Sequence, residues 1–278
     1  MVTDRKIYKY QVLIMVMDKK FLHTINADIV KDSYIALNET LDKKVYFFSG
    51  GMSVQLFLPE HIHRVSSDLD LNGVIRLSNV EFKDVLTPGL NRLAEKGYFS
   101  EFKKQHYTFD INLENDEELL VLQFPRKSES SFQSTKKTLE RELENVESVN
   151  YVGTDLNVIS SEDIILHKLL RSKMFQKSYG ITPINDVDLC KIGGMLTQHK
   201  KEFQLNAYNL SPEEISTRVA EIRLAADIYD IVALSIYKGI NKEYFKEGLK
   251  SYDSLKHDKS LLIDYLQKIN PNVFNKNN

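Results

Sequence analysis

The order of short segments between residues 45 and 74 limits the possible folds more than any other feature of this chain. Residues 45–48 (VYFF) are β-branched or aromatic and run into a Ser-Gly-Gly sequence, which predicts a buried strand that ends at a tight turn. Residues 52–58 are compatible with a helix. Residues 67–74 alternate apolar with polar side chains, as in a strand with one buried and one polar face. The segment therefore predicts strand, glycine turn, helix and strand within an α+β fold.

The rest of the N-terminal half predicts further helices and strands. Residues 26–44 carry apolar side chains at helical spacing. Residues 80–96 suit an amphipathic helix, kinked or split near its middle, where Pro88 stands. Residues 107–113 and 118–124 predict two strands joined as a hairpin, which would form the second half of a mixed sheet.

A change in sequence pattern indicates two domains. Residues 128–147 are polar and highly charged, which favours either a solvated excursion or a mobile flap near a site. Beyond this segment the pattern is helical: Ser160 opens a sequence typical of a capping box, and Ser211 opens another before Pro and two Glu residues. We expect one domain with a mixed sheet at residues 1–152 and a helical bundle at residues 153–278.

Composition excludes several classes of protein. The 37 basic and 39 acidic side chains give a formal charge of -2, which argues against a surface that coats nucleic acid over its whole extent. The single cysteine, Cys190, forms no intramolecular disulfide, and no apolar run approaches the roughly 20 residues that a membrane span needs. These features, together with the lack of a secretory signal pattern, favour a cytoplasmic protein without a membrane segment.

Asp68 and Asp70 are the strongest candidates for chemistry. Acidic side chains at i and i+2 of one strand project from the same face, with Cα atoms about 6 to 7 Å apart. Their carboxylates can share hard cations such as Mg²⁺ or Mn²⁺, which steady the attacking and leaving oxygens of phosphoryl and nucleotidyl transfer. Leu69 between them would point into the core and fix the strand.

The glycine turn is the second part of the candidate site. Gly50, Gly51 and Ser53 lie between a predicted strand and a predicted helix, where backbone N–H groups and a hydroxyl can approach the phosphates of an NTP closely. Taken separately, an acidic pair is usually a solvated strand face and a Gly-Gly pair is usually a simple turn. Their combination in this order is much less common by chance, so it favours a nucleotide site.

Residues 47–71, with the sequence FFSGGMSVQLFLPEHIHRVSSDLDL, resemble the first motif of the polymerase-β-like nucleotidyltransferases. The pattern Gly-Gly, spacer, then R-x-S-x-D-x-D, formed by Arg64, Ser66, Asp68 and Asp70, is similar to the AbiEii/AbiGii type nucleotidyltransferase toxins of abortive-infection and toxin-antitoxin systems. This resemblance implies that the aspartates bind metal and nucleotide, and that an antitoxin partner is encoded nearby. Arg64 and Ser66 either bind nucleotide or hold the loop and the Asp68 carboxylate in place.

A second region extends the resemblance. The family usually has a helical lysine followed by an arginine and a short acidic motif, and Lys168, Arg171, Asp186 and Asp188 occupy corresponding places. Lys168 and Arg171, three residues apart on one helix face, would offset charge on the triphosphate. Alternatively, the two basic side chains simply extend from an amphipathic helix and the two acidic ones favour a helix N-terminus.

Some positions depart from the family pattern. Met52 stands where a threonine is common, and the two acids of the second motif are two residues apart rather than three. A third metal-binding carboxylate is often found on a neighbouring strand, where this chain offers Asp110 but has Gln123 on the other strand. Asp110, Asp186 and Asp188 therefore remain alternatives for completing the acidic site.

The acceptor of the nucleotide is suggested by the resemblance and by local charge. Several family members modify the 3′ end of tRNA, which implies an RNA acceptor. Residues 166–201 hold seven basic side chains against two acidic ones, a local charge of +5, which fits either an RNA-binding surface or a solvated helix face. Two alternatives are transfer to a small molecule or protein, and a non-catalytic relative that binds nucleotide or RNA.

Overall fold

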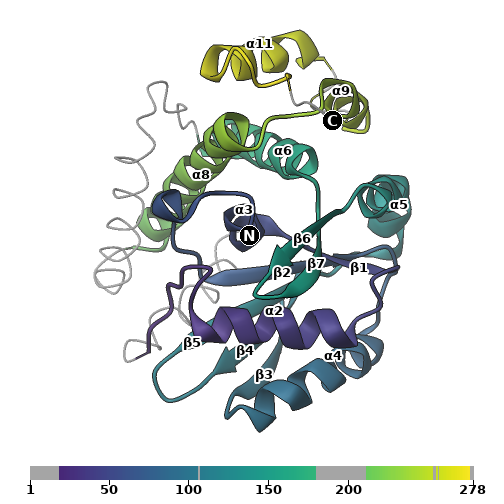
Figure 1. Ribbon diagram of the computed structural model, residues 1–278, viewed down its shortest axis with the longest axis vertical. Helices are drawn as coiled ribbons and strands as arrows, with labels where there is room; N and C mark the ends of the chain where they lie inside the picture. Colours follow the sequence, from purple (N-terminus) through teal and green to yellow (C-terminus); the bar gives the residue numbers. More distant parts are fainter. Residues whose placement is uncertain (1–18, 106, 180–210, 253–254, 256, 276–278) are drawn as a thin grey trace. The chain divides into compact units, whose positions relative to one another are not determined.

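The structure, a computed structural model, describes residues 19–105, 107–179, 211–252, 255 and 257–275 (Figure 1). These residues divide into two compact units. The sheet unit comprises Lys19–Phe57 and Val65–Ser160. The helical unit comprises Leu58–Arg64 and the described residues from Ser161 onward. The expected boundary between residues 152 and 153 falls within the sheet unit, eight residues before the point at which the described contacts divide.

Among the described residues, a mixed sheet of seven strands forms the centre of the sheet unit. Its strands are β1 (Tyr46–Ser49), β2 (Asp68–Gly73), β3 (Phe99–Lys104), β4 (Thr108–Glu114), β5 (Leu119–Pro125), β6 (Glu147–Tyr151) and β7 (Thr154–Val158). The order across the sheet is β3-β4-β5-β2-β1-β7-β6. The β2·β5 and β1·β7 pairs are parallel and the other pairs are antiparallel. The expected α+β class with a mixed sheet is confirmed.

Two helices cover one face of the sheet, α2 (Asp28–Thr40) and α4 (Asn79–Glu95), seen in front of the strands in Figure 1. Residues at alternate strand positions meet these helices: Leu69 and Ile111 are fully buried, and the ring of Phe82 in α4 stacks on Phe109 at a centroid distance of 4.6 Å. This apolar layer forms the core of the unit, since strand side chains alternate between faces. Part of this layer was predictable from the sequence, where Leu69 and Leu71 of β2 alternate with polar residues.

Residues 128–147 differ from the expected solvated excursion or flap. They form the helix α5 (Glu129–Glu144), which begins after Ser128, whose hydroxyl accepts a hydrogen bond from the amide of Ser131 at 3.2 Å. Phe132 and Leu139 are buried, seven residues apart and hence on one side of the helix. The high charge of the other sides concealed this narrow apolar stripe. Likewise, α4 runs through Pro88 as one helix.

Over its described residues, the helical unit contains the four α-helices α6 (Ser161–Tyr179), α8 (Pro212–Tyr237), α9 (Lys242–Lys250) and α11 (Lys259–Ile269). It also contains the short 3₁₀ helix η1 (Glu60–Ile62). The predicted start of α8 is confirmed, because Ser211 and Glu214 form a reciprocal capping box with Pro in the first turn. A helical C-terminal region is therefore present, as expected. In the part of the chain that is described, no helix combines the length and apolar character needed to cross a membrane.

Candidate active site

Strand β2 places Asp68 and Asp70 on the same face of the sheet. Burial alternates along the strand: Leu69 and Leu71 lie in the core shared with α2 and α4, while the two aspartates are half-buried on the opposite face. At a rise of about 3.3 Å per residue their Cα atoms stand roughly 6 to 7 Å apart. The two carboxylates are thus close enough to act on one ligand.

The glycine turn lies directly against Asp70. Ser49, the last residue of β1, pairs with Asp70 across the antiparallel β1·β2 ladder, and Gly50 begins the short helix α3 (Gly50–Gln55). Gly50 has a φ of +77°, and a Cβ atom there would lie 1.7 Å from Asp70 Oδ2 and 2.7 Å from Asp70 Cβ. A glycine is required at this position both by the backbone conformation and by the space that Asp70 occupies.

Ser53 does not face the polar side of the sheet. Its side chain is fully buried, and its Oγ lies 3.2 Å from the hydroxyl of Tyr34 in α2. Burial is the largest influence on the pKa of Tyr34 and raises it, and the hydrogen bond with Ser53 partly opposes this rise. The expected contact between Ser53 and the triphosphate is therefore not supported, because the hydroxyl fastens α3 to α2 inside the core.

Ser66 orients one of the two carboxylates. Its Oγ donates a hydrogen bond to Asp68 Oδ1 at 3.0 Å. Its backbone exchanges two hydrogen bonds with His23, at 2.8 and 2.9 Å. The His23 ring in turn contacts the carbonyl oxygen of Leu119 at 2.8 Å. Of the two roles weighed for Ser66, these contacts favour positioning of Asp68.

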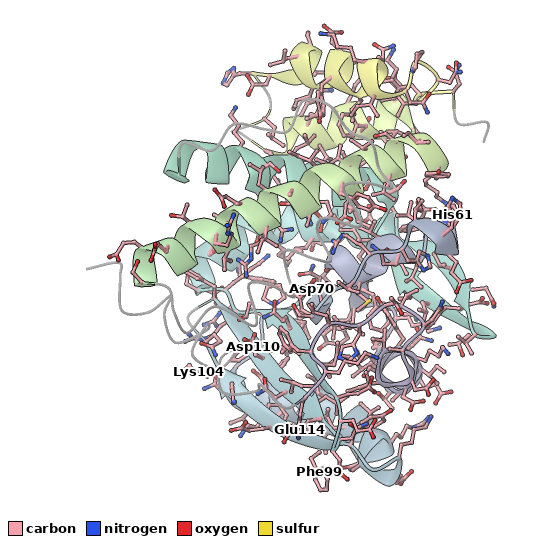
Figure 2. The ribbon with its side chains drawn as sticks, turned by 90° about the vertical axis from the view of Figure 1, so that its left-hand side faces the viewer. His61, Asp70, Phe99, Lys104, Asp110 and Glu114 are labelled. Atoms are coloured by element: carbon pink, nitrogen blue, oxygen red, sulfur yellow. The ribbon has the colours of Figure 1, made fainter. Side chains whose placement is uncertain are left out.

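Asp110 is separated from Asp70 by one strand of the sheet. Asp70 pairs with Gln123 on β5, and Gln123 pairs with Asp110 on β4, so a whole strand separates the two acids. With strands about 4.8 Å apart, their Cα atoms are roughly 9 to 10 Å apart; Figure 2 shows the two labelled side chains apart on the sheet. Among the described residues, no group of three His, Cys, Asp or Glu side chains is arranged to hold a metal. Asp110 is thus not a direct neighbour of Asp70 in the register, and its role as a metal ligand stays a prediction.

Three of the predicted basic residues gather in the helical unit around a pair of aspartates. Lys168 Nζ lies 3.2 Å from Asp227 Oδ1 and 2.6 Å from Asp230 Oδ2. Arg64 Nε donates to Asp230 Oδ1 at 2.7 Å, and Arg171 Nε donates to Asp227 Oδ2 at 2.7 Å. Arg64, Lys168, Arg171, Asp227 and Asp230 are hereafter the ion-pair cluster. Helices α6 and α8, which carry four of its members, lie side by side (Figure 1).

The electrostatics of the ion-pair cluster distinguish its members. Burial alone would raise the pKa of Asp230, but the charges and hydrogen bonds of Arg64 and Lys168 outweigh it and lower the pKa overall. Lys168 is only 3% exposed and contacts two carboxylates, whereas the Arg171 side chain is 45% exposed. Lys168 therefore acts in the structure as part of a buried ion pair, and Arg171 is the member that can meet an anion from solvent.

Asp227 and Asp230 were missed in the sequence analysis. They lie three residues apart within an otherwise apolar stretch of α8, and the same spacing separates Lys168 and Arg171 on α6. Two acids in such a stretch indicate buried charges that need partners. Asp186 and Asp188 lie outside the described residues, so their place in the acidic site stays a prediction.

Comparisons with known proteins give weak similarities. No family model matches the chain, and no curated protein matches it significantly. Among solved structures, it is similar to an antigenic nucleotidyltransferase-like protein from Paracoccidioides brasiliensis, with 16% identity and a TM-score of 0.43 over 88% of this chain and 95% of that one. It is also similar to a cytoplasmic RNA terminal U-transferase, with 11% identity and a TM-score of 0.21 over 70% of this chain and 51% of that one. At these values neither similarity carries an argument about activity.

The close contact between Gly50 and Asp70 predicts an unequal response to two alanine substitutions. Gly50 and Gly153 both have a φ of +77°, but a Cβ at Gly153 would meet nothing within 4 Å. Both variants should lose about 1 to 2 kcal/mol from the left-handed backbone. Gly50→Ala should lose about 1 to 3 kcal/mol more, because Asp70 must move. Urea unfolding measures the difference, and equal losses would contradict the contact.

The ion-pair cluster predicts a large loss of stability when one acid is removed. Asp230→Ala leaves Arg64 and Lys168 buried without this partner and should cost about 3 to 5 kcal/mol. The matched control on the same helix is Glu221→Ala, which removes a solvent-exposed ion pair with Arg218 and should cost less than about 1 kcal/mol. The denaturant midpoints of the two variants measure these losses of stability. Similar midpoints would contradict the claim that Asp230 forms a buried ion pair with Arg64 and Lys168.

The lowered pKa of Asp230 also predicts a pH dependence of stability. A carboxyl group with a folded-state pKa below its ordinary value of 3.8 stabilises the fold above that pH, and this contribution disappears as the pH falls through the folded-state value. The free energy of unfolding should therefore fall as the pH drops below about 4, and fall less steeply in Asp230→Asn, which cannot ionise. Parallel slopes for the two proteins would show that Asp230 does not contribute to the acid response.

Proposed function

We propose that this protein is a nucleotidyltransferase that depends on Mg²⁺ or Mn²⁺ held by Asp68 and Asp70. An acceptor hydroxyl loses its proton and bonds to the α-phosphorus of an NTP, so that NMP is transferred and pyrophosphate leaves. One observation carries the proposal: the two carboxylates share one face of β2, and Asp70 lies over the Gly50 backbone with no side chain between them. The resemblance of residues 47–71 to the first motif of polymerase-β-like enzymes supports the same conclusion.

The residues of the sheet unit suit a divalent cation of the Mg²⁺ type. Mg²⁺ is usually held by one or two carboxylates, with substrate phosphates and water completing its coordination, so the pair Asp68 and Asp70 is sufficient. Ser66 fixes the direction of Asp68 through its hydrogen bond to Oδ1. When bound, the cation supplies electrostatic stabilisation of the charge that develops on the transferred phosphoryl group.

The remaining residues have distinct roles in this proposal. Gly50 has no side chain, so its backbone lies directly against the Asp70 carboxylate. The backbone N–H groups of Gly50 and Gly51, at the start of α3, would bind phosphate oxygens beside it. The Arg171 side chain is 45% exposed, and its guanidinium is paired with Asp227 within the helical unit. Arg64 and Lys168, both nearly buried, stabilise the helical unit through Asp230 rather than serving as free phosphate ligands.

The acceptor proposed here is RNA, specifically the 3′ end of tRNA, and the biological role is that of a toxin with an antitoxin partner. These parts of the proposal depend on the resemblance of the R-x-S-x-D-x-D pattern to the AbiEii/AbiGii type toxins. The basic character of residues 166–201 also supports an RNA acceptor, although most of that segment lies outside the described residues.

The experiment incubates purified protein and Mg²⁺ with total RNA, purified tRNA, a protein extract or a small-molecule extract, using each α-³²P-labelled NTP in turn. We expect label in tRNA and its loss by about 10²- to 10³-fold in Asp68→Ala and Asp70→Ala, since each removes several kcal/mol of charge stabilisation. The control is Glu101→Ala on the edge strand β3, an exposed acid that should leave labelling unchanged.

The four acceptor pools separate the parts of the proposal. Label in the protein or small-molecule pool would retain the enzyme and reject the RNA acceptor. Labelling that survives in Asp70→Ala at the wild-type rate would reject the metal site itself. For the toxin role, expression of the wild-type protein should halt growth while Asp70→Ala should not, and equal toxicity would reject that role.

A further inference from the structure

A row of polar side chains crosses the sheet beside Asp70. Gln123 on β5 stands between Asp70 on β2 and Asp110 on β4, each being its direct partner in the strand register. Directly paired residues of neighbouring strands project from the same face, so all three side chains share the polar face. Gln123 is 9% exposed and Asp110 is 5% exposed. Such burial of an amide and a carboxyl group requires a defined hydrogen-bonding arrangement.

Asp110 determines which end of the Gln123 amide faces it. Gln123 Nε2 donates a hydrogen bond to Asp110 Oδ1 at 3.2 Å. The amide nitrogen donates and the carboxyl oxygen accepts, so the NH₂ end of the amide faces Asp110. The carbonyl end of the planar amide then turns away from β4, toward the side on which β2 carries Asp70. Within the described part of the chain, the Gln123 side chain makes no second hydrogen bond.

An oxygen at this position is suited to a hard cation. Amide carbonyl oxygens are common ligands of such ions, and the Gln123 oxygen belongs to the strand adjacent to Asp68 and Asp70. The residue of β5 that pairs with Asp68 on the same face is Val121, which has no side-chain oxygen. Among the residues of β5 that pair with the two aspartates on this face, Gln123 is thus the one with a side-chain oxygen.

From this geometry we infer that the carbonyl oxygen of Gln123 is a third ligand of the cation held by Asp68 and Asp70, and that Asp110 is a positioning residue that orients it. The inference rests on the proposed function, since it adds to the same cation site. It replaces the expectation that Asp110 itself binds the metal. It also accounts for a glutamine, rather than a carboxylate, beside Asp70: a neutral oxygen adds a ligand without adding charge repulsion.

The test measures Mn²⁺ binding to the full-length protein by electron paramagnetic resonance of the free ion, with no nucleotide present. Gln123→Met keeps the length of the side chain but lacks the oxygen, so its Kd for Mn²⁺ should rise about 10-fold or more. Asp110→Leu should give a similar rise, since the amide loses its orientation. Asp110→Asn retains an acceptor for Gln123 Nε2 and should bind Mn²⁺ within about 3-fold of wild type.

Two further variants separate a ligand role from a purely structural one. Asn112→Ala is the matched control: Asn112 lies on the same face of β4 and is 7% exposed, but it pairs with Val121. Its Mn²⁺ affinity should equal that of wild type. Gln123→Met combined with Asp110→Leu should bind Mn²⁺ no more weakly than Gln123→Met alone, because Asp110 acts through Gln123.

Each outcome bears on a different claim. If Asp70→Ala loses Mn²⁺ binding while Gln123→Met retains wild-type affinity, the third-ligand inference is overturned and the proposed function stands. If Asp70→Ala binds Mn²⁺ as wild type does, both fail. Should Gln123→Met not fold, Gln123→Glu combined with Asp110→Asn keeps an oxygen at position 123 and places a hydrogen-bond donor opposite it. This variant should bind Mn²⁺ at least as tightly as wild type, and weaker binding would overturn the inference.

Discussion

The close contact between Asp70 and Gly50 is the constraint on which the candidate site depends. It is maintained from both sides of β2: Leu69 and Leu71 are held in the core, and Ser49 is paired with Asp70 in the ladder. A shift of one residue along the strand would bury both aspartates and expose both leucines, so the register is strongly fixed. The positions of the carboxylates therefore follow from the same burial that stabilises the sheet.

The R-x-S-x-D-x-D pattern, which is continuous in sequence, is divided in the structure. The contacts pass from the helical unit to the sheet unit between Arg64 and Val65. Arg64 is paired with Asp230, whereas Ser66 donates a hydrogen bond to Asp68. The arginine thus stabilises one unit, and the serine orients the Asp68 carboxylate in the other. A motif that suggests a single binding loop contains a buried ion pair and a positioning hydrogen bond.

The parts of the fold that were predictable are those with a local signal, such as the alternation along β2 and the capping box at Ser211. Helix α5 was missed because only a narrow side of it is buried, and β3 because most of its side chains are exposed at the sheet edge. The partners of Lys168 lie 59 and 62 positions away, and the separation of Asp110 from Asp70 depends on strand order. Such long-range relations leave no periodic pattern in the sequence.

The central claim is that Asp68 and Asp70 jointly hold a divalent cation. The most direct measurement is anomalous X-ray diffraction from crystals of the protein grown with Mn²⁺ and a non-hydrolysable NTP analogue. The account predicts an anomalous peak within about 2.0 to 2.3 Å of one carboxylate oxygen from each aspartate, the range for hard cations with oxygen ligands. A well-ordered β2 without a peak at these carboxylates, or with the ion bound elsewhere, would contradict it.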